Sequence, residues 1–553
     1  MTKKLEVEKL KAEIERLKKE LKKKKKYGLV WEEKPEEVVE MCKEKLPVLK
    51  EVKNKEIITD KDKPVNLLIE GDNYHALSVL NYTHQGKIDV IYIDPPYNTG
   101  NKDFKYNDRY VDREDSYRHS KWLTFMSKRL RLAKTLLSDE GVIFISIGDD
   151  ELAQLKIVCD DVFGEENLLS IISRKSKATS NKGNFFSPST DYILAYAKNC
   201  LRLGGFDDPI AQKKESYLKL FKYKDSRGRY NIVSLYMPAL KGNRPSRYYI
   251  TCPDDSKVIP PGDRFWRWSE KTFIKNNADD RVVYKKTNTS PLVDEDGKKA
   301  KWNIYTKLYL HERQETGIRP LSFIDDMPNS LGSKELIQMG INFPYSKPRA
   351  LIEFIISITN KEKDIIVLDF FAGSGTTTHA VLNLNNLDQG RRTSIICTNN
   401  EENICTDVCY PRIKKVIEGY KNLKGKDVKG LGGNLKYFKT DFVDAELTDI
   451  NKIKLTKQAT EMLCVKEGTF EKVVDNEKFK IFKNSNHYTG IIWDQAAILA
   501  FKKAIKDIKG KFSVYIFSLG DETFEEEFED IKQEVQLYPI PEAILRVYRR
   551  ILK

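Results

Sequence analysis

The sequence predicts an α/β fold built on a parallel β-sheet with helices on both faces. Three short apolar runs, at residues 65–69, 89–93 and 141–147, alternate with helical segments, and the same alternation returns between residues 348 and 397. Continuous apolar runs are typical of strands buried on both faces, and strand–helix alternation is typical of parallel sheets. The segment between the two regions is more irregular and is interrupted by Pro, Gly and Asn, which indicates an insertion into the α/β domain.

Composition excludes several classes of protein. Of 553 residues, 40% are hydrophobic and 32% are charged, which is typical of a globular protein rather than a disordered or fibrous one. The longest uncharged stretch, residues 370–387, is broken by Gly, Ser, Thr, His and Asn, and we expect no membrane segment. The eight cysteines form no CxxC pair and the beginning of the sequence is Lys/Glu-rich, so we expect reduced thiols, a cytoplasmic location and no metal site.

Residues 1–30 are predicted to form a separate charged helix. Apolar side chains recur there at spacings of three and four, at Val7, Leu10, Ile14, Leu17 and Leu21. This is a heptad seam of little more than two repeats, which is short for an autonomous coiled coil. A helix docked on its own chain and a contact with a second copy or another partner are both compatible with it.

The remaining boundaries follow changes in pattern and charge. Residues 171–350 hold 33 basic and 19 acidic side chains, a net charge of +14 that equals the net charge of the whole chain. A positive middle region between near-neutral or acidic flanks predicts that this region binds a polyanion. A small α/β tail follows a Gly-rich stretch at 430–433. The expected segments are 1–30, 60–170, 171–345, 346–444 and 445–553.

The first motif with chemical content is Asp94-Pro95-Pro96-Tyr97, at the end of the second predicted strand. Ligands of open α/β sheets bind at the carboxyl ends of the strands. Two consecutive prolines fix φ and cannot donate hydrogen bonds, so the loop is rigid and its carbonyls are free to accept. A carboxylate, a carbonyl and an aromatic ring suit a planar heterocycle that carries an amino group. The alternative is a Pro-rich strand end with a simple Asp turn.

The second motif is the run from Asp369 through Phe371 to Gly373 and Gly375, where a strand meets a glycine turn and then a helix. Glycines let a ligand approach the backbone closely, and the first amides of a helix can bind an anionic group. The third glycine of the dinucleotide pattern and the lysine of a phosphate loop are both absent. Glu401, just after the next strand, is placed to bind ribose hydroxyls. A nucleoside cofactor without a pyrophosphate therefore fits better than NAD or ATP.

Together the two motifs resemble the amino-methylating DNA methyltransferases that use S-adenosyl-L-methionine. In this family the same features occur as a catalytic Asp-Pro-Pro-Tyr and a cofactor Phe-x-Gly-x-Gly. The catalytic motif comes first here, by about 275 residues, and this permuted order resembles the β class of the family. Shorter phrases, such as Asp225-Ser226-Arg227-Gly228-Arg229 and Lys347-Pro348, resemble the modification (Mod) subunits of type III restriction-modification systems. The resemblance implies a Rossmann-like methyltransferase domain with an inserted target-recognition region.

The resemblance also implies a mechanism. Asp94 and the Pro95 carbonyl would accept the two hydrogens of an exocyclic amine, N6 of adenine, and so stabilise the positive charge that develops on it. The target base must leave the duplex, and Tyr97 would stack on it; Pro96 holds the loop rigid. The cofactor would be bound by Asp94, Asp369, Phe371, Gly373, Gly375 and Glu401, with Asp72 on its adenine and Lys347 in the segment that closes over its methionine part. A turn-capping role for Asp72 is a close alternative.

Residues 171–345 are predicted to read duplex DNA, because basic and aromatic side chains alternate there. The candidate DNA-binding residues are Arg227, Arg229, Arg244, Arg247, Arg264 and Arg267. Trp266 and Trp268 are more simply explained as core residues. A homodimer and a restriction (helicase-nuclease) subunit are both candidate partners.

Three alternatives stay open: methylation of cytosine N4, an RNA amino-methyltransferase, and a DNA-specificity subunit that no longer catalyses. Methylation of cytosine carbon 5 needs the cysteine of a Pro-Cys dipeptide, which this sequence lacks.

Overall fold

The structure is a computed structural model that describes residues 31–177, 185–209, 215–238, 246–359, 362–485, 487–520, 522 and 524–552. The predicted N-terminal helix, residues 1–30, and the candidate DNA-binding residue Arg244 lie outside these ranges. The chain divides into two compact units, residues 1–204 with 321–553 and residues 205–320. Among the described residues, no helix is both long and apolar enough to cross a membrane.

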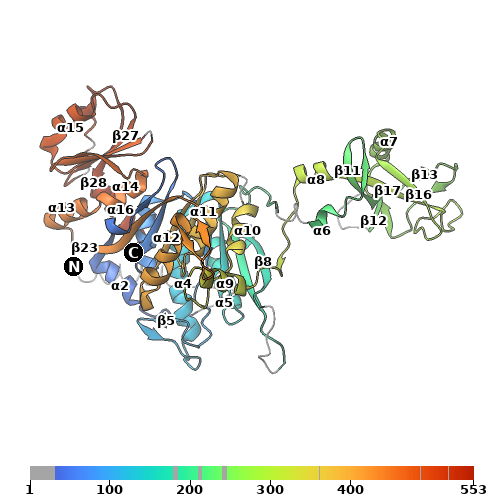
Figure 1. Ribbon diagram of the computed structural model, residues 1–553, viewed down its shortest axis with the longest axis horizontal. Coiled ribbons are helices and arrows are strands. Elements are labelled where there is room, and N and C mark those ends of the chain that lie inside the picture. The colour runs from blue at the N-terminus through green and yellow to red at the C-terminus, as the bar shows by residue number, and fades with distance from the viewer. Residues whose placement is uncertain are drawn as a thin grey trace, which may run out of the picture. The chain divides into compact units, whose positions relative to one another are not determined.

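The first unit is built on an eleven-stranded mixed sheet, ten strands of which form one continuous path (Figure 1). In spatial order these ten are β1 (Lys45–Glu51), β23 (Asn434–Asp444), β3 (Val65–Glu70), β20 (Thr393–Thr398), β19 (Ile366–Asp369), β4 (Ile88–Ile93), β7 (Leu137–Ile147), β9 (Thr190–Ala197), β8 (Leu168–Lys175) and β18 (Phe323–Ile324). The eleventh strand, β2 (Ile57–Ile58), pairs with β23. The path from β23 to β7 is parallel throughout, as the sequence predicts.

Helices cover both faces of this sheet. On one face lie α3 (Asn73–Thr83), α4 (Arg118–Leu136) and α5 (Leu152–Phe163), and on the other α10 (Arg349–Thr359), α11 (Thr376–Asp388) and α12 (Tyr410–Glu418). Alternate residues of one strand serve the two layers: Leu67 and Ile69 of β3 pack with the α3 and α4 layer, and Leu68 packs with α12. This double burial explains why the strands are continuous apolar runs. The fold is a Rossmann-like α/β fold.

The second unit, residues 205–320, has its own core. A four-stranded antiparallel sheet joins β10 (Tyr223–Asp225), β11 (Gly228–Ser234), β17 (Trp302–Tyr309) and β16 (Val282–Lys286). Two short two-stranded sheets complete it, β12 (Tyr236–Pro238) with β15 (Arg264–Trp266) and β13 (Ile250–Thr251) with β14 (Lys257–Val258). Its helices are α6 (Glu215–Leu218), α7 (Glu270–Ala278) and α8 (Leu310–Thr316). Trp266 lies in this core and Trp268 packs against it, as expected.

This unit is narrower than the predicted recognition region, 171–345. β8, β9 and β18 pair in the large sheet, and α9 (Asn329–Gln338) also belongs to the first unit. The apolar alternation of β8 and β9 does not reveal which sheet they join. The unit carries 24 basic and 15 acidic side chains, a net charge of +9.

The predicted C-terminal region, 445–553, has a sheet of its own within the first unit. The strands of this sheet, in spatial order, are β24 (Glu471–Asp475), β25 (Phe479–Lys483), β26 (His487–Ile492), β27 (Lys511–Phe517) and β28 (Glu534–Ile540). The helices of the region are α13 (Asp449–Gln458), α14 (Thr460–Glu467), α15 (Ile498–Ile505) and α16 (Glu542–Ile551). α14 and α16 pack on α3, and the buried Tyr548 donates a hydrogen bond of 2.5 Å to the Pro47 carbonyl. This region therefore also covers one face of the large sheet.

Candidate active site

The two motifs lie on neighbouring parallel strands although about 275 residues separate them in the sequence. β4 runs directly into Asp94, and β19 ends at Asp369, with Val367 opposite Val90 in the register. Both loops therefore leave from the same edge of the sheet. β20 and β3 continue that edge and end just before Glu401 and Asp72.

Asp94 has one carboxylate oxygen paired and one free. Lys347 Nζ donates to Asp94 Oδ2 at 2.5 Å, and only 9% of the Lys347 side chain is exposed. Asp94 Oδ1 is buried, and no group among the described residues donates to it. A buried carboxylate oxygen without a donor is costly, so this atom is poised to accept a hydrogen bond from a ligand. Lys347 thus contacts the Asp94–Tyr97 motif although 253 residues separate it from Asp94 in the sequence.

Tyr97 is held from three sides. Lys347 Nζ lies 5.1 Å from the centre of its ring, and its hydroxyl donates a long hydrogen bond of 3.5 Å to Asp191 Oδ2. A Cβ at Gly148, the residue after β7, would lie only 2.8 Å from the ring. Burial, and then the neighbouring Asp94 and Asp191 carboxylates, raise the pKa of Tyr97 well above its usual value. The tyrosine is therefore a neutral, oriented ring beside the free oxygen of Asp94.

The loop that carries these residues is fixed by side chains from α4 and from the start of α5. The buried Trp122 donates its indole N–H to the Pro96 carbonyl at 2.8 Å. Asn98, in the left-handed region at φ 56°, donates to the buried Glu151 at 2.6 Å. No described residue donates a hydrogen bond to the Pro95 carbonyl. Of the two proline carbonyls, only that of Pro95 stays available to a ligand.

The glycine turn after β19 has the conformation that its residues require. Gly373 and Gly375 have φ values of 48° and 76°, in the left-handed region where glycine is favoured, and α11 begins at the next residue. A side chain at Gly375 would also meet Cys409 Sγ at 3.0 Å. The aromatic ring of Phe371 packs at 5.9 Å from that of Phe125 on α4.

Asp369 organises this turn from inside. Its carboxylate accepts hydrogen bonds from the Phe371 amide at 3.0 Å and from Thr377 Oγ1 at 2.6 Å. Burial raises the pKa of Asp369 to about 7. The side chain is 3% exposed and both oxygens are occupied, so the structure shows a turn-stabilising contact for this predicted cofactor ligand.

A buried arginine joins the glycine turn to the lysine that pairs with Asp94. Arg412, at the start of α12, donates to Thr376 Oγ1 at 2.7 Å, to Ser374 Oγ at 3.0 Å and to Glu335 at 2.8 Å. Ser346, next to Lys347, lies 3.1 Å from Ser374 in the same cluster. The segment 346–348 therefore contacts both motifs at once.

Asp72 and Glu401 lie farther along the same edge. Asp72 caps α3 by accepting from the Tyr74 amide at 2.7 Å, which is the capping role that the sequence left open, and its side chain stays 29% exposed. Glu401 is 46% exposed and forms an ion pair of 3.1 Å with Lys105, from the loop that follows the catalytic motif. Both carboxylates can be reached from solvent.

In the second unit, several predicted DNA-binding arginines hold the fold. Arg247 donates to the backbone carbonyls of Pro260, Pro261 and Arg264, each at 2.8 Å. Arg229 donates to two carbonyls, and Arg227 binds the carbonyl and carboxylate of Asp279. Arg264 lies over the ring of Tyr236. These guanidinium groups are partly exposed, but their hydrogen bonds are made within the unit.

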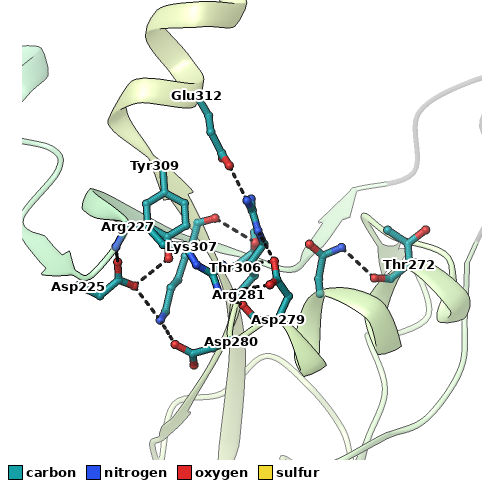
Figure 2. Close-up of polar contacts among 11 residues, drawn as sticks. Asp225, Arg227, Thr272, Asp279, Asp280, Arg281, Thr306, Lys307, Tyr309 and Glu312 are labelled. Atoms are coloured by element: carbon teal, nitrogen blue, oxygen red, sulfur yellow. Dashed lines mark hydrogen bonds and ion pairs between the residues drawn. The ribbon is translucent and has the colours of Figure 1, made fainter.

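A hollow of about 450 Å³ opens in this unit between β11, β17 and α8. Figure 2 shows that two of its basic residues are neutralised: Lys307 pairs with Asp225 and Asp280, and Arg281 with Asp279 and Glu312. Three other lining residues are Arg267, Trp268 and Arg313. Arg267 uses only its Nε, toward the Ser234 carbonyl, and Arg313 has no side-chain partner among the described residues. Among the predicted arginines that the structure describes, Arg267 lines this hollow.

Several residues of the candidate site could not be selected from the sequence. Gly148 and Trp122 act through contacts with the catalytic loop, and Arg174 and Asp191 form a buried pair on β8 and β9 that reaches Tyr97. The only sequence signal was a glycine after the third predicted strand, and no local pattern marked the others.

The sheet order, the glycine turn and the acid-Pro-Pro-Tyr loop on adjacent strands define an α/β protein with a Rossmann-like methyltransferase fold. The model of the DNA methylase family (N6_N4_Mtase) matches residues 88–408, more than half of the chain. The chain belongs to this DNA methylase family.

The chain is also similar to individual proteins. The chain is 35% identical over 364 residues to the type III restriction-modification enzyme StyLTI Mod subunit of Salmonella typhimurium, covering 60% of this chain and 52% of that one. It is 31% identical over 370 residues to the type II methyltransferase M.KpnI of Klebsiella pneumoniae, covering 62% and 82%. The solved PvuII DNA methyltransferase (cytosine-N4-specific) aligns with a TM-score of 0.33 at 12% identity, over 64% of this chain and 92% of that one. The chain spans about half the length of the type III Mod relatives that it matches.

Proposed function

We propose that this protein transfers a methyl group from S-adenosyl-L-methionine to N6 of an adenine that has been flipped out of duplex DNA. The observation that carries the proposal is the free, buried Oδ1 of Asp94 beside the ring of Tyr97, one strand away from the glycine turn. Membership of the DNA methylase family supports the reaction class.

Each residue of the catalytic motif has a separate task. N6 of adenine is a poor nucleophile because its lone pair is delocalised into the ring. Asp94 Oδ1 and the Pro95 carbonyl, neither of which has a donor among the described residues, would accept its two hydrogens and stabilise the developing charge. Tyr97 would stack on the base and recover part of the cost of unstacking, a few kcal/mol.

Lys347 serves the same carboxylate from the other side. Its ammonium group occupies Oδ2, which keeps the carboxylate in one orientation and leaves Oδ1 for the amine. The Arg412 cluster ties this lysine segment to the glycine turn, so that the donor and acceptor sides of the reaction are held in one geometry. Fixing two reactants in this way can supply on the order of 7 kcal/mol or more of the barrier reduction.

The cofactor-binding residues fit a nucleoside with a charged amino-acid tail. When bound, S-adenosyl-L-methionine supplies an activated methyl group on its sulfonium. Gly373, Gly375 and Phe371 would line the side of the methionine part, and Asp369 would hold their turn in shape. Glu401 and Asp72, both partly exposed at the ends of β20 and β3, would accept from ribose and adenine groups.

We further propose that the unit 205–320 contacts the target sequence and that the protein acts in the cytoplasm, in a restriction-modification or a solitary methylation system. Similarity to type III Mod subunits supports the first kind of system. A restriction (helicase-nuclease) subunit and a second copy of this chain are the partners to test.

The experiment is modified-base sequencing of the genome of a methylation-free host that expresses either the wild-type chain or the variant Asp94→Ala. The proposal predicts N6-methyladenine within one sequence motif for the wild type and none for the variant. N4-methylcytosine in place of N6-methyladenine, no modified base, or methylation that persists in the variant would contradict it.

A further inference from the structure

Two adjacent phenylalanines stand in solvent between β8 and β9. Phe185 and Phe186 are 94% and 91% exposed and, with Leu201, are the three most exposed large apolar side chains of the described residues. Single exposed apolar residues are common, but two neighbouring aromatic rings kept in water are a mark of an interaction site.

The strand register places this hairpin at the edge where Tyr97 lies. Tyr192, near the start of β9, is opposite Ile147, the last residue of β7, and Lys175, the last residue of β8, is opposite Thr190. The chain between β8 and β9 therefore leaves from the carboxyl end of β7, next to Gly148 and the ring of Tyr97. The hairpin is closed by a hydrogen bond of 2.9 Å from the Ser176 amide to the Ser189 carbonyl.

The base of the hairpin also contacts the catalytic tyrosine. Asp191, five residues after Phe186, accepts the long hydrogen bond from the Tyr97 hydroxyl and is fixed by the buried Arg174 at 2.8 Å. Five extended residues span at most about 17 Å. The backbone of Phe186 therefore lies within about 17 Å of Asp191, the residue whose carboxylate contacts Tyr97.

The positive charge beside the two rings indicates which kind of partner binds there. Lys175 and Lys177 are exposed and have no acidic partner among the described residues. An aromatic pair with two free lysines complements a polyanion whose bases can stack, whereas a purely apolar protein partner would leave the lysines unpaired.

We infer that Phe185 and Phe186 form a wedge that enters duplex DNA beside the target adenine and fills the space the flipped base leaves. Apolar side chains inserted at base steps can replace lost stacking and so stabilise an opened duplex. The inference rests on the proposed function and adds to it the residues that would open the duplex, outside the catalytic motif.

The test compares the variant Phe185→Ser/Phe186→Ser with Leu201→Ser, a matched change of an equally exposed apolar residue after the other end of β9. Both enzymes receive a duplex with the mapped target adenine opposite thymine, and the same duplex with an abasic site opposite the adenine. In the second duplex the adenine is already unpaired.

For the double variant we expect kcat/KM on the paired duplex to fall about tenfold or more, because each base–aromatic contact is energetically significant. On the abasic duplex the loss should shrink to less than about threefold, and Leu201→Ser should match the wild type on both. Fluorescence of 2-aminopurine at the target position should report less flipping by the double variant, with cofactor binding and thermal unfolding unchanged.

Several results would overturn the inference while leaving the proposed function intact. These are wild-type activity of the double variant on the paired duplex, an equal loss on both duplexes, or a change of oligomeric state without a change in methylation of the paired duplex. Absence of methyl transfer by the wild type would instead refute the proposed function, and the wedge with it.

Discussion

A single added methyl group at Gly148 should displace the ring of Tyr97, the predicted stacking residue. In Gly148→Ala the new Cβ would lie 2.8 Å from Cδ2 of the Tyr97 ring, 3.5 Å from Cε2 and 3.6 Å from Cγ. Carbon atoms pack best at about 3.5–4.0 Å, so the ring has to move by roughly 0.7–1.2 Å. Because misplacement by about 1 Å can cost on the order of a hundredfold in rate, we expect methyl transfer to slow by about 10–100-fold.

The assay is single-turnover transfer of a labelled methyl group to a duplex that contains the mapped site, with saturating enzyme. Gly204→Ala is the control, because nothing lies within 4 Å of a Cβ at that position. Overpacking should also cost about 1–3 kcal/mol of stability, so thermal unfolding is measured beside it. A wild-type transfer rate in a folded Gly148→Ala protein, or an equal loss in Gly204→Ala, would refute the reasoning.

Three further predictions concern stability and binding. The raised pKa of Asp369, about 7, means that its contribution to the free energy of unfolding is complete below about pH 4 and is lost as the pH rises through 7. For the wild type, the free energy of unfolding from urea curves should therefore decline by on the order of 4 kcal/mol between pH 4 and pH 8 because of this group, and Asp369→Asn should remove that decline. The same dependence on pH in wild type and variant would contradict this. Asp191→Ala should lower the free energy of unfolding by about 3–5 kcal/mol, since it leaves the buried Arg174 without its carboxylate, and a loss below 1 kcal/mol would argue against that pairing. Arg247→Ala should lower the melting temperature of the protein, because this side chain binds backbone carbonyls of its own unit. Arg313→Ala should leave the melting temperature unchanged and reduce the slope of log K for DNA binding against log salt concentration by about one. The reverse pattern would show that Arg313 stabilises the fold and Arg247 binds phosphate.

The sequence predicted the central strands well because their burial on both faces leaves continuous apolar runs. It could not predict that β19 pairs with β4, since about 275 residues separate them and strand order depends on tertiary packing. Nor could it assign β8 and β9, which were expected in the recognition region but extend the large sheet. Local pattern identifies strands, and it does not identify their neighbours.

The candidate site divides in a similar way. The motif residues were predictable because acid-Pro-Pro-Tyr and the paired glycines each impose a backbone geometry. Their partners were not, because Gly148 and Trp122 act across the fold on the catalytic loop. For charged residues such as Arg247, the sequence does not decide between binding DNA and stabilising the fold. An arginine side chain can bind a phosphate or backbone carbonyls, and the structure shows that Arg247 binds three carbonyls.

The most direct test of the proposed chemistry measures cofactor binding and methyl transfer in the same Asp94→Asn protein. Because Asp94 is also a predicted cofactor-binding residue, calorimetry with S-adenosyl-L-methionine should show binding that weakens far less than methyl transfer does. Mass spectrometry of nucleosides from the treated duplex should find N6-methyl-2′-deoxyadenosine with the wild type and a loss of at least a hundredfold with the variant. Transfer at the wild-type rate by Asp94→Asn, or a wild type that binds the cofactor and yields no N6-methylated adenine, would contradict the central claim.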